Sequence, residues 1–342
     1  MPPTTVLVTG GAGFIGSHTC VELLEHGYEV VVVDDYSNSS PEALERVAKI
    51  AGRPLAAVHR ADLRDRRALD AVFAAHPIDA VIHFAAKKAV GESVRIPIAY
   101  YDVNVGGTTA LLAAMHAHGV RRMVFSSSCS VYGDATKVPL TEADPAAPTN
   151  PYATTKWICE QVLADTCHRL PELGVLALRY FNPVGAHPSG LLGEDPRGVP
   201  NNIMPYLAQV AVGRRERLTV FGDDYPTPDG TGIRDYVHVV DVAEGHRRAL
   251  EHLGDENGLR VFNLGTGVGS SVLDLVRAFG SASGRPVPYE VAGRRPGDVA
   301  ELVADPGAVA AAWGWSPTRG LAAMCEDAWR FQELHPDGYV TG

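Results

Sequence analysis

The chain has 342 residues, of which 46% are hydrophobic and 20% are charged, a balance typical of a globular protein with a sizeable core. Its formal net charge of −10 argues against a broad nucleic-acid-binding face, which needs clustered Lys and Arg to replace counterions. No apolar window approaches the roughly 18 residues that a membrane helix needs, so we expect no membrane partner.

Short apolar runs alternate with helical patterns through the first half of the chain. The predicted helices include 17–26 and 107–118, and the predicted strands cover 6–9, 29–34, 79–85, 123–127 and 175–180. The second strand is nearly all valine, which suits burial on both faces of a parallel sheet. This alternation predicts an α/β fold of the Rossmann type, a doubly wound parallel sheet whose ligands lie beyond the carboxyl ends of the strands.

The composition changes after about residue 183. Residues 187–202 and 222–232 are rich in Gly, Pro, Asp and Asn, which is typical of loops. We expect residues 1–184 to form the parallel-sheet domain, and residues 185–342 to form mainly a smaller mixed α/β lobe. Segments near 237–271 are expected to return to the first domain.

A glycine-rich segment follows the first predicted strand directly. Its Gly10, Gly13 and Gly16 allow a tight turn, a close approach of backbone to a pyrophosphate and the packing of helix on strand. Asp34 ends the second strand, where a carboxylate accepts hydrogen bonds from a ribose 2′-OH and repels a 2′-phosphate. The spacing therefore predicts an NAD site. Asp62, after the third strand, is either an adenine contact or a helix cap.

A tyrosine and a lysine lie four residues apart on a predicted helix. Asn150 and Pro151 suit the start of that helix, which puts Tyr152 and Lys156 on one face. A free tyrosine, with a pKa near ~10, is a poor base at neutral pH. We expect an ammonium about 5 Å away, at an effective dielectric of ~20, to favour the phenolate by roughly 3 kcal/mol. With Ser128 at the end of a strand, Tyr152 becomes a candidate acid and base.

The N-terminal residues and the cysteines bear on the cellular compartment. The first residues run straight into a strand without a basic region or a cleavage site, so we expect no signal peptide. The five cysteines show no CxxC pair and no metal-ligand spacing with histidine. This pattern is typical of reduced thiols, and we expect a cytoplasmic protein without a metal.

Several longer motifs extend over nearly the whole chain. They include the glycine loop at 9–18, VIHFAA at 81–86, AVGESV at 89–94, SSS at 126–128, LRYFNPVGAHPSG at 178–190, GEDP at 193–196, PNNIMP at 200–205, DGTGIRDYVH at 229–238 and the RR and GD pairs at 294–298. On these motifs the chain resembles the extended short-chain dehydrogenase/reductases. Within that family its motifs are most similar to those of the UDP-glucose 4-epimerases.

The resemblance implies an enzyme that interconverts UDP-glucose and UDP-galactose, keeps NAD bound and forms a homodimer. Tyr152 would take the proton of the sugar 4-OH while C4 gives a hydride to NAD⁺, and the 4-keto sugar would turn and receive the hydride on its other face. The residues implied to catalyse this reaction are Ser128, Tyr152 and Lys156. Those implied to line NAD are Gly10, Gly13, Phe14, Ile15, Gly16, Asp34, Asn38, Ser39, Asp62, Leu63, Phe84, Ala85, Ala86, Lys88, Asn104, Tyr152, Lys156 and Phe181. Those implied to hold the UDP-sugar substrate are Lys88, Ser128, Tyr152, Asn182, Asn202, Thr219, Val220, Phe221, Arg234, Arg295, Asp298 and Leu302.

Two positions depart from the family pattern. Val103 stands where some members have an Asn that contacts the cofactor, and Asn104 is the replacement that we predict. Leu302 stands at the implied wall of the sugar pocket, where members range from Tyr to Cys or Ser. Leucine is intermediate in size, so the sequence leaves open whether N-acetylated sugars are accepted.

Three other functions are consistent with parts of the pattern. A related 4,6-dehydratase would need an Asp-Glu pair where this chain has Cys129 and Ser130, which disfavours it. An epimerase of UDP-N-acetylhexosamines or UDP-pentoses stays open, since only Leu302 bears on it. A non-catalytic NAD-binding regulator would have no need for Ser128, Tyr152 and Lys156 together.

Overall fold

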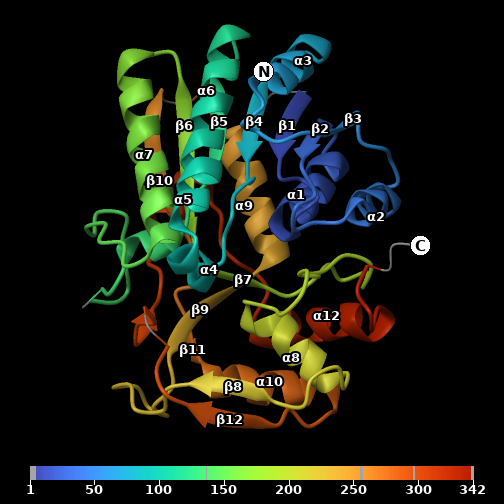
Figure 1. Cartoon of the computed structure of the whole chain (residues 1–342), viewed down its shortest axis with the longest axis vertical. Coiled ribbons are helices and arrows are strands. Elements are labelled where there is room, and N and C mark those ends of the chain that lie inside the picture. The colour runs from blue at the N-terminus through green and yellow to red at the C-terminus, as the bar shows by residue number, and fades with distance from the viewer. Residues whose placement is uncertain (1–4, 136, 255–256, 296, 340–342) are drawn as a thin grey trace.

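A parallel sheet forms the centre of the larger part of the molecule (Figure 1). The computed structural model describes residues 5–135, 137–254, 257–295 and 297–339. Within these ranges the sheet has seven strands in the order β10-β6-β5-β4-β1-β2-β3, which confirms the predicted doubly wound fold. The strands are β1 Thr5–Thr9, β2 Glu29–Asp34, β3 Ala57–Arg60, β4 Ala80–His83, β5 Arg122–Ser126, β6 Gly174–Tyr180 and β10 Gly258–Leu264.

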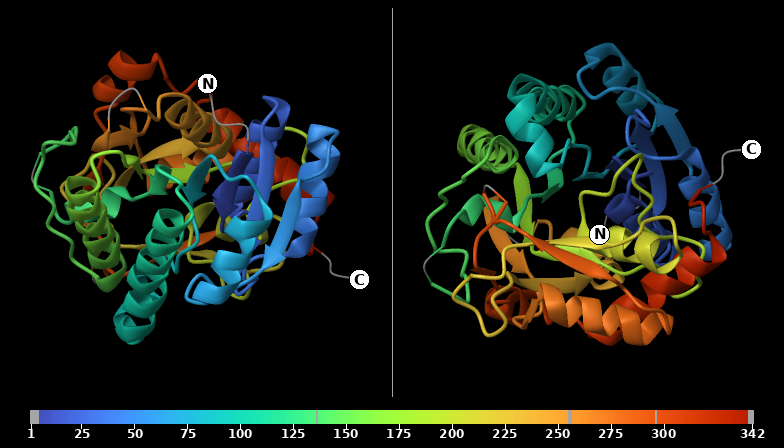
Figure 2. Two further views of the ribbon diagram at one scale, coloured as in Figure 1. Left: turned by 90° about the horizontal axis from the view of Figure 1, so that it is seen from above. Right: turned by 60° about the horizontal axis from the view of Figure 1, so that its bottom comes forward.

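Helices cover both faces of the sheet because its strands are apolar on both sides. In β1, Val6 and Val8 belong to one buried cluster, whereas Leu7 belongs to the other. The first cluster is closed by α1 Phe14–Glu25, α2 Pro41–Ala51, α9 Val239–Glu251 and α11 Gly307–Trp313. The second is closed by α3 Arg66–Ala75, α6 Gly107–Ala117 and α7 Pro151–Arg169. Figure 2 shows from two further directions that α6 and α7 lie on the same side of the sheet.

A smaller lobe lies beyond the carboxyl ends of the main strands (Figure 1). One mixed sheet contains β7 Asn182–Val184, β9 Ile233–His238, β11 Gly269–Ser271 and β13 Glu301–Leu302, and a parallel pair contains β8 Leu218–Phe221 and β12 Tyr289–Ala292. The lobe's own apolar core joins α8 Ile203–Ala211, α10 Val272–Ser283 and α12 Leu321–Leu334. The predicted mixed α/β composition of the smaller lobe is therefore confirmed.

Short helical segments follow β4 and β5 at the carboxyl edge of the main sheet. They are α4 Val90–Arg95, α5 Pro97–Tyr100, the π-helix η1 Tyr101–Gly106, which continues into α6, and the 3-10 helix η2 Cys129–Tyr132, which follows β5. None of the helices in the described ranges is long and apolar enough to cross a membrane.

The first helix begins earlier than the sequence pattern predicts. It starts at Phe14 rather than at residue 17, so the last turn of the glycine loop is already helical. The reason is Gly16, where a Cβ would collide with the carbonyl oxygen of Gly10, so that only glycine lets this turn pack on the loop. The predicted strands agree with the observed ones to within two residues at each end.

Segments from the second half of the chain contribute to both parts. Residues 261–264 lie in β10, which pairs with β6 at the edge of the main sheet. Helix α9 packs on α1 under the same sheet, and its Val242 and Leu250 are buried there. Residues 237 and 238, in contrast, belong to β9 and pair with β7 in the smaller sheet.

Candidate active site

The glycine loop lies against the end of β4. Gly10 has a φ of +70°, and its N–H donates to the Val33 carbonyl at 2.8 Å. A Cβ on Gly10 would lie 2.7 Å from the backbone nitrogen of Ala85, so the loop and the residues after β4 are in close contact. Phe14 and Ile15, in the first turn of α1, are partly exposed. The loop therefore presents backbone N–H groups at a helix N-terminus, as a pyrophosphate requires.

Asp34 joins the glycine loop to the end of β2. Its buried carboxylate accepts hydrogen bonds from the Ala12 N–H at 2.9 Å, the Tyr36 N–H at 2.9 Å and the Ser39 hydroxyl at 2.8 Å. Burial raises the pKa of Asp34, and these hydrogen bonds oppose the rise. Tyr36 has a φ of 58°, a left-handed conformation that is rare for a bulky residue and often marks a binding site. Asn38 is exposed beside this turn.

The third strand is followed by a carboxylate that forms ion pairs. Asp62 accepts hydrogen bonds from Arg64, which also pairs with Asp102. The N-cap of α3 is Asp65, so the alternative that Asp62 caps a helix is wrong. Leu63, next to Asp62, is buried and packs beneath Gly107. An adenine contact at Asp62 stays a prediction.

Asn104 uses its whole side-chain amide within the protein. Its Oδ1 accepts from the Lys87 N–H at 2.8 Å, and its Nδ2 donates to the Lys87 carbonyl at 3.0 Å and to the Thr155 hydroxyl at 2.9 Å. Asn104 therefore ties the segment after β4 to α7. These contacts fix the backbone beside Ala86 and Lys88, two of the residues predicted to line the cofactor.

Helix α7 carries the predicted proton-transfer pair. Asn150 accepts from the Ala153 N–H at 2.9 Å and Pro151 occupies the first turn, so the helix begins as the sequence predicts. Tyr152 and Lys156 are both buried on this helix. Ser128 caps η2, accepts from the Ser130 hydroxyl at 2.9 Å and hydrogen-bonds the phenol of Tyr152. Ser128, Tyr152 and Lys156 are thus brought together at the carboxyl edge of the main sheet.

The electrostatics of this group differ from the prediction. Burial raises the pKa of Tyr152 to about 12, while the hydrogen bond from Ser128 lowers it. Burial also lowers the pKa of Lys156 to about 8. The Lys156 ammonium donates to the Ser126 carbonyl at 2.7 Å and lies 5.1 Å from the centre of the Phe125 ring. The predicted lowering of the Tyr152 pKa by Lys156 is therefore wrong for the protein alone, because desolvation of the phenolate dominates.

A partly exposed set of residues lies at the surface of the smaller lobe. Arg295 pairs with Asp298 at 2.9 Å, and its guanidinium lies 5.6 Å from the centre of the Phe221 ring. We call Phe221, Arg295 and Asp298 the arginine edge. Phe221 is the last residue of β8, which also carries Thr219 and Val220. The structure therefore joins two motifs that are more than 70 residues apart in the sequence.

Leu302 lies where the lobe meets the segment after β5 that carries Ser128. In β13 it is paired in register with Arg234 of β9. Its side chain belongs to a small buried cluster with Cys129 and Phe181, and Cys129 is the neighbour of Ser128. Burial raises the pKa of the Cys129 thiol to about 12, so this cysteine is packed rather than nucleophilic.

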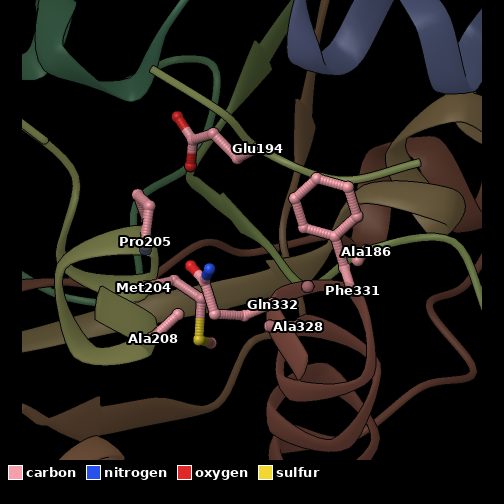
Figure 3. Close-up of a pocket in the computed structure, with 9 residues that line it drawn as sticks. Ala186, Glu194, Met204, Pro205, Ala208, Ala328, Phe331 and Gln332 are labelled. Carbon is pink, nitrogen blue, oxygen red and sulfur yellow. The ribbon is translucent and has the colours of Figure 1, made fainter. Parts of the chain in front are cut away.

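A carboxylate bridges the two parts of the molecule. Glu194 accepts from the Lys88 ammonium at 2.9 Å and from the Asn202 amide at 2.6 Å. Figure 3 shows Glu194 at one end of a small pocket between α8 and α12, with its carboxylate turned away from Phe331. Its Oε2 and the Oδ1 of Asn182 are buried and have no hydrogen-bond partner within the described ranges. Such atoms are able to bind a ligand or water.

Two acidic residues near the site were not among the predicted site residues. Glu194 lies in the GEDP motif, but a carboxylate among loop residues gave no chemical reason to select it. Glu160 lies one helical turn beyond Lys156, and only this spacing could have indicated it. Within the described residues, no group of three or more His, Cys, Asp or Glu side chains is placed to hold a metal.

Comparisons with known proteins agree with this geometry. The family model described as "NAD dependent epimerase/dehydratase family" matches residues 6–265. The UDP-glucose 4-epimerase of Bacillus subtilis is 58% identical over 98% of this chain and 99% of its own. The structure of the Bifidobacterium longum UDP-glucose 4-epimerase with NAD⁺ and UDP has a TM-score of 0.96 and 51% identity over 98% of this chain and 100% of that chain. A Stenotrophomonas maltophila UDP-glucose-4-epimerase with NAD and formylated UDP-arabinopyranose has a TM-score of 0.94 and 48% identity, covering 97% and 99%.

The chain belongs to the NAD dependent epimerase/dehydratase family. The family resemblance inferred from the motifs is confirmed by the family model and by relatives that match over nearly the whole chain.

Proposed function

We propose that this chain is an NAD-dependent isomerase that acts as a UDP-glucose 4-epimerase, interconverting UDP-glucose and UDP-galactose through a transient 4-keto sugar. The observation that carries the proposal is that Ser128, Tyr152 and Lys156 come together at the carboxyl edge of the same parallel sheet that carries the glycine loop after β1. The arginine edge on the lobe supplies the second half of a nucleotide-sugar site. The similar proteins of Bacillus subtilis and Bifidobacterium longum support the assignment.

The residues at the carboxyl edge of the sheet fit NAD. The close packing at Gly10 and Gly16 leaves the backbone free to meet a pyrophosphate, and Asp34 is held where a ribose would lie. Phe84 and Phe181 follow β4 and β6 and add apolar surface at the same edge. When bound there, NAD⁺ supplies a hydride acceptor and a positive charge beside Tyr152.

Tyr152 is the group that holds and moves the proton. Its phenol takes the proton of the sugar 4-OH and returns it to the same oxygen after the sugar has turned, so no net proton leaves the site. The Ser128 hydroxyl orients the phenol and stabilises its ionised form. Lys156, directed to the Ser126 carbonyl, adds a fixed positive charge in a region from which water is excluded.

The arginine edge is suited to hold the UDP part. A guanidinium matches phosphate oxygens in a bidentate fork, and Arg295 now makes the same kind of contact with Asp298. The exposed aromatic ring of Phe221 is suited to stack against the nucleobase of UDP. With the nucleotide held by the lobe and the proton-transfer group fixed on α7, the sugar between them is left free to turn.

Two related substrate classes stay open. The Stenotrophomonas maltophila relative was crystallised with a UDP-pentose derivative, which keeps UDP-pentoses as candidates. Whether UDP-N-acetylhexosamines are accepted as substrates depends on the space beside Leu302. The Leu302 side chain is buried in this structure. A non-catalytic NAD-binding regulator is disfavoured by the assembled group of Ser128, Tyr152 and Lys156.

We further propose that the protein is a cytoplasmic homodimer. The five cysteines are all free and buried, which is typical of a reducing compartment. Exposed apolar side chains on α4 and α5, with Ile98 83% exposed and Val94 62% exposed, are suited to be covered by a second copy of the chain.

The proposed function is tested by separate incubation of the purified protein with UDP-galactose, UDP-GalNAc and UDP-xylose, with the products identified by NMR. We expect UDP-glucose from UDP-galactose without added NAD, and retention in the product of deuterium placed on C4 of the sugar. Loss of that deuterium to solvent, or strict dependence on consumed NADPH, would contradict the proposal.

A further inference from the structure

The end of β5 is bound to one face of α7 by three consecutive serines. Each serine contacts a different residue of the helix, and these helical residues are spaced four apart, so they share a face. The pairs are Ser128 with Tyr152, the Ser126 carbonyl with Lys156 at 2.7 Å, and the Ser127 hydroxyl with Glu160 at 2.5 Å. Two of the three pairs contain the proposed catalytic residues, and the third contains a carboxylate that the mechanism has not used.

Glu160 is part of a buried ion pair with the neighbouring strand. Its carboxylate accepts two hydrogen bonds from Arg179 of β6, at 2.6 and 3.0 Å. Glu160 is 1% exposed and Arg179 is 4% exposed, so both charges are withdrawn from water. The Arg179 guanidinium also lies 4.9 Å from the centre of the Tyr132 ring, at the end of η2. The pair thus connects α7, β5 and β6 with the helix that Ser128 begins.

The charged and titratable groups near Lys156 are few. From β4, His83 faces the lysine, and burial lowers its pKa to about 3, so this ring is neutral at pH 7. On α7, the neighbours are the Cys159 thiol, whose pKa burial raises, and the Glu160 carboxylate. From β6, Arg179 is engaged by Glu160. Among these described groups, Glu160 is the carboxylate, and its charge favours the ammonium form of Lys156 against the effect of burial.

We propose that Glu160, held by Arg179, is a positioning residue of the proton-transfer site, which fixes Ser127 and thereby Ser128 against α7 and keeps Lys156 charged. This proposal rests on the proposed function only where it predicts that substitution of Glu160 lowers turnover. Glu160 acts through its contact with Ser127 and its charge near Lys156.

The test is the Glu160→Gln variant, with two separate readouts. The chain has only five lysines, so ¹³C-lysine labelling gives few signals, and Lys156→Met identifies the one of interest. Loss of the carboxylate is expected to lower the pH at which Lys156 titrates by about one unit, since an opposite charge a helical turn away favours the charged form. We expect the alkaline limb of the kcat profile to move in the same direction, with kcat reduced about tenfold and KM nearly unchanged.

Two control variants separate positioning from general damage. Asp241→Asn removes another buried carboxylate with an arginine partner, Arg319, outside the site, and it should destabilise the protein without moving the Lys156 titration. Ser127→Ala removes the serine contact alone, and it should lower kcat without shifting the alkaline limb. If Glu160→Gln does not fold, Glu160→Leu combined with Arg179→Met replaces the pair by apolar packing and should still shift the titration.

The outcomes distinguish this proposal from the proposed function. A Glu160→Gln protein whose Lys156 titrates at the wild-type pH, and which loses no more activity than Asp241→Asn, would overturn the positioning role. A wild-type protein that fails to interconvert UDP-sugars would instead overturn the proposed function, and the NMR titration would still decide whether Glu160 holds the charge on Lys156.

Discussion

The two sides of the site are built differently. On one side, Ser128, Tyr152 and Lys156 are each at least 90% buried and bound to the main sheet or to η2. On the other, the Arg295 side chain is 49% exposed and forms an ion pair with the nearby Asp298. The comparison indicates that the groups proposed for proton transfer are fixed before a ligand arrives, whereas those proposed for the nucleotide can exchange one anionic partner for another.

The energetics of the two sides follow from their exposure. An exposed ion pair such as Arg295 with Asp298 contributes only about 0–1 kcal/mol to stability, so its replacement by a phosphate costs little. In the buried group, desolvation controls ionisation, and it moves the pKa of Tyr152 up and that of Lys156 down. Substitutions on the buried side should therefore affect turnover, and those on the exposed side should affect binding.

The largest expected effect is on the buried side, in Tyr152→Phe. Removal of the phenolic oxygen should lower turnover by at least ~100-fold, the usual size of a general acid-base contribution. Bound NAD, measured by absorbance after denaturation, should stay at the wild-type level because the glycine loop and Asp34 are unchanged. Tyr236→Phe, at a buried tyrosine in the lobe core, is the matched control and should stay active. Near wild-type turnover in Tyr152→Phe would refute the assignment.

The corresponding change on the exposed side is Arg295→Ala. Loss of a charge-assisted hydrogen bond worth about 1.5–3 kcal/mol should raise KM for the UDP-sugar by roughly tenfold to a hundredfold, with kcat changed by less than about threefold. Steady-state kinetics with UDP-galactose give both constants. Arg294→Ala is the control, because that arginine is paired with Asp224 and lies over Tyr225. Equal effects of the two substitutions would remove the specific role of Arg295.

The two sides also differ in how far the sequence predicted them. The strand-helix alternation, the glycine loop and the helix start at Asn150 depend on local rules, and the structure agrees with them to within a few residues. The residues of the buried side were predicted as a set, but the predicted lowering of the Tyr152 pKa by Lys156 is wrong for the protein alone. Spacing along a helix placed Lys156 beside Tyr152, yet it could not show that the ammonium is directed to the Ser126 carbonyl.

Contacts between segments that are distant in the sequence could not be predicted from local sequence patterns. The Glu160 pair with Arg179 joins a helix to a strand, and the bridge from Lys88 to Glu194 joins residues 106 positions apart. The sequence shows only that charged residues occur in these motifs, and it does not show that they pair with each other. The placement of Phe221 under Arg295 likewise depends on how β8 packs in the lobe.

Acid should destabilise the protein through His246, a buried and neutral histidine of α9 that packs against Phe84. Burial lowers the pKa of His246 to about 4, below the unfolded value of 6.5, so the unfolded state binds a proton first as the pH falls. Stability from this group is complete above pH 6.5 and is lost as the pH falls toward 4, by roughly 2 kcal/mol at pH 5. Urea unfolding at pH 7 and pH 5 should therefore show a smaller acid loss in His246→Leu than in the wild type. An unchanged loss would mean that His246 is protonated in the folded state.

The smallest expected effect concerns Leu302, which lies where the two sides meet. Its side chain is buried beside Cys129 and Phe181, and Cys129 follows Ser128, which we propose to be catalytic. Leu302→Ser should open space at this point and raise the ratio of kcat/KM for UDP-GalNAc to that for UDP-galactose by about tenfold, the usual size of a steric discrimination of a few methylenes. Competition of the two sugars in one NMR sample measures this ratio directly.

The control for Leu302 is its neighbour in the chain. Val303 is equally buried, but successive side chains along an extended segment point to opposite sides, and Val303 lies near Gly269. Val303→Ser should therefore lower stability by a similar amount and leave the substrate ratio unchanged. If both variants alter the ratio equally, the change comes from a general loosening of the lobe, and the sugar pocket must be limited by residues other than Leu302.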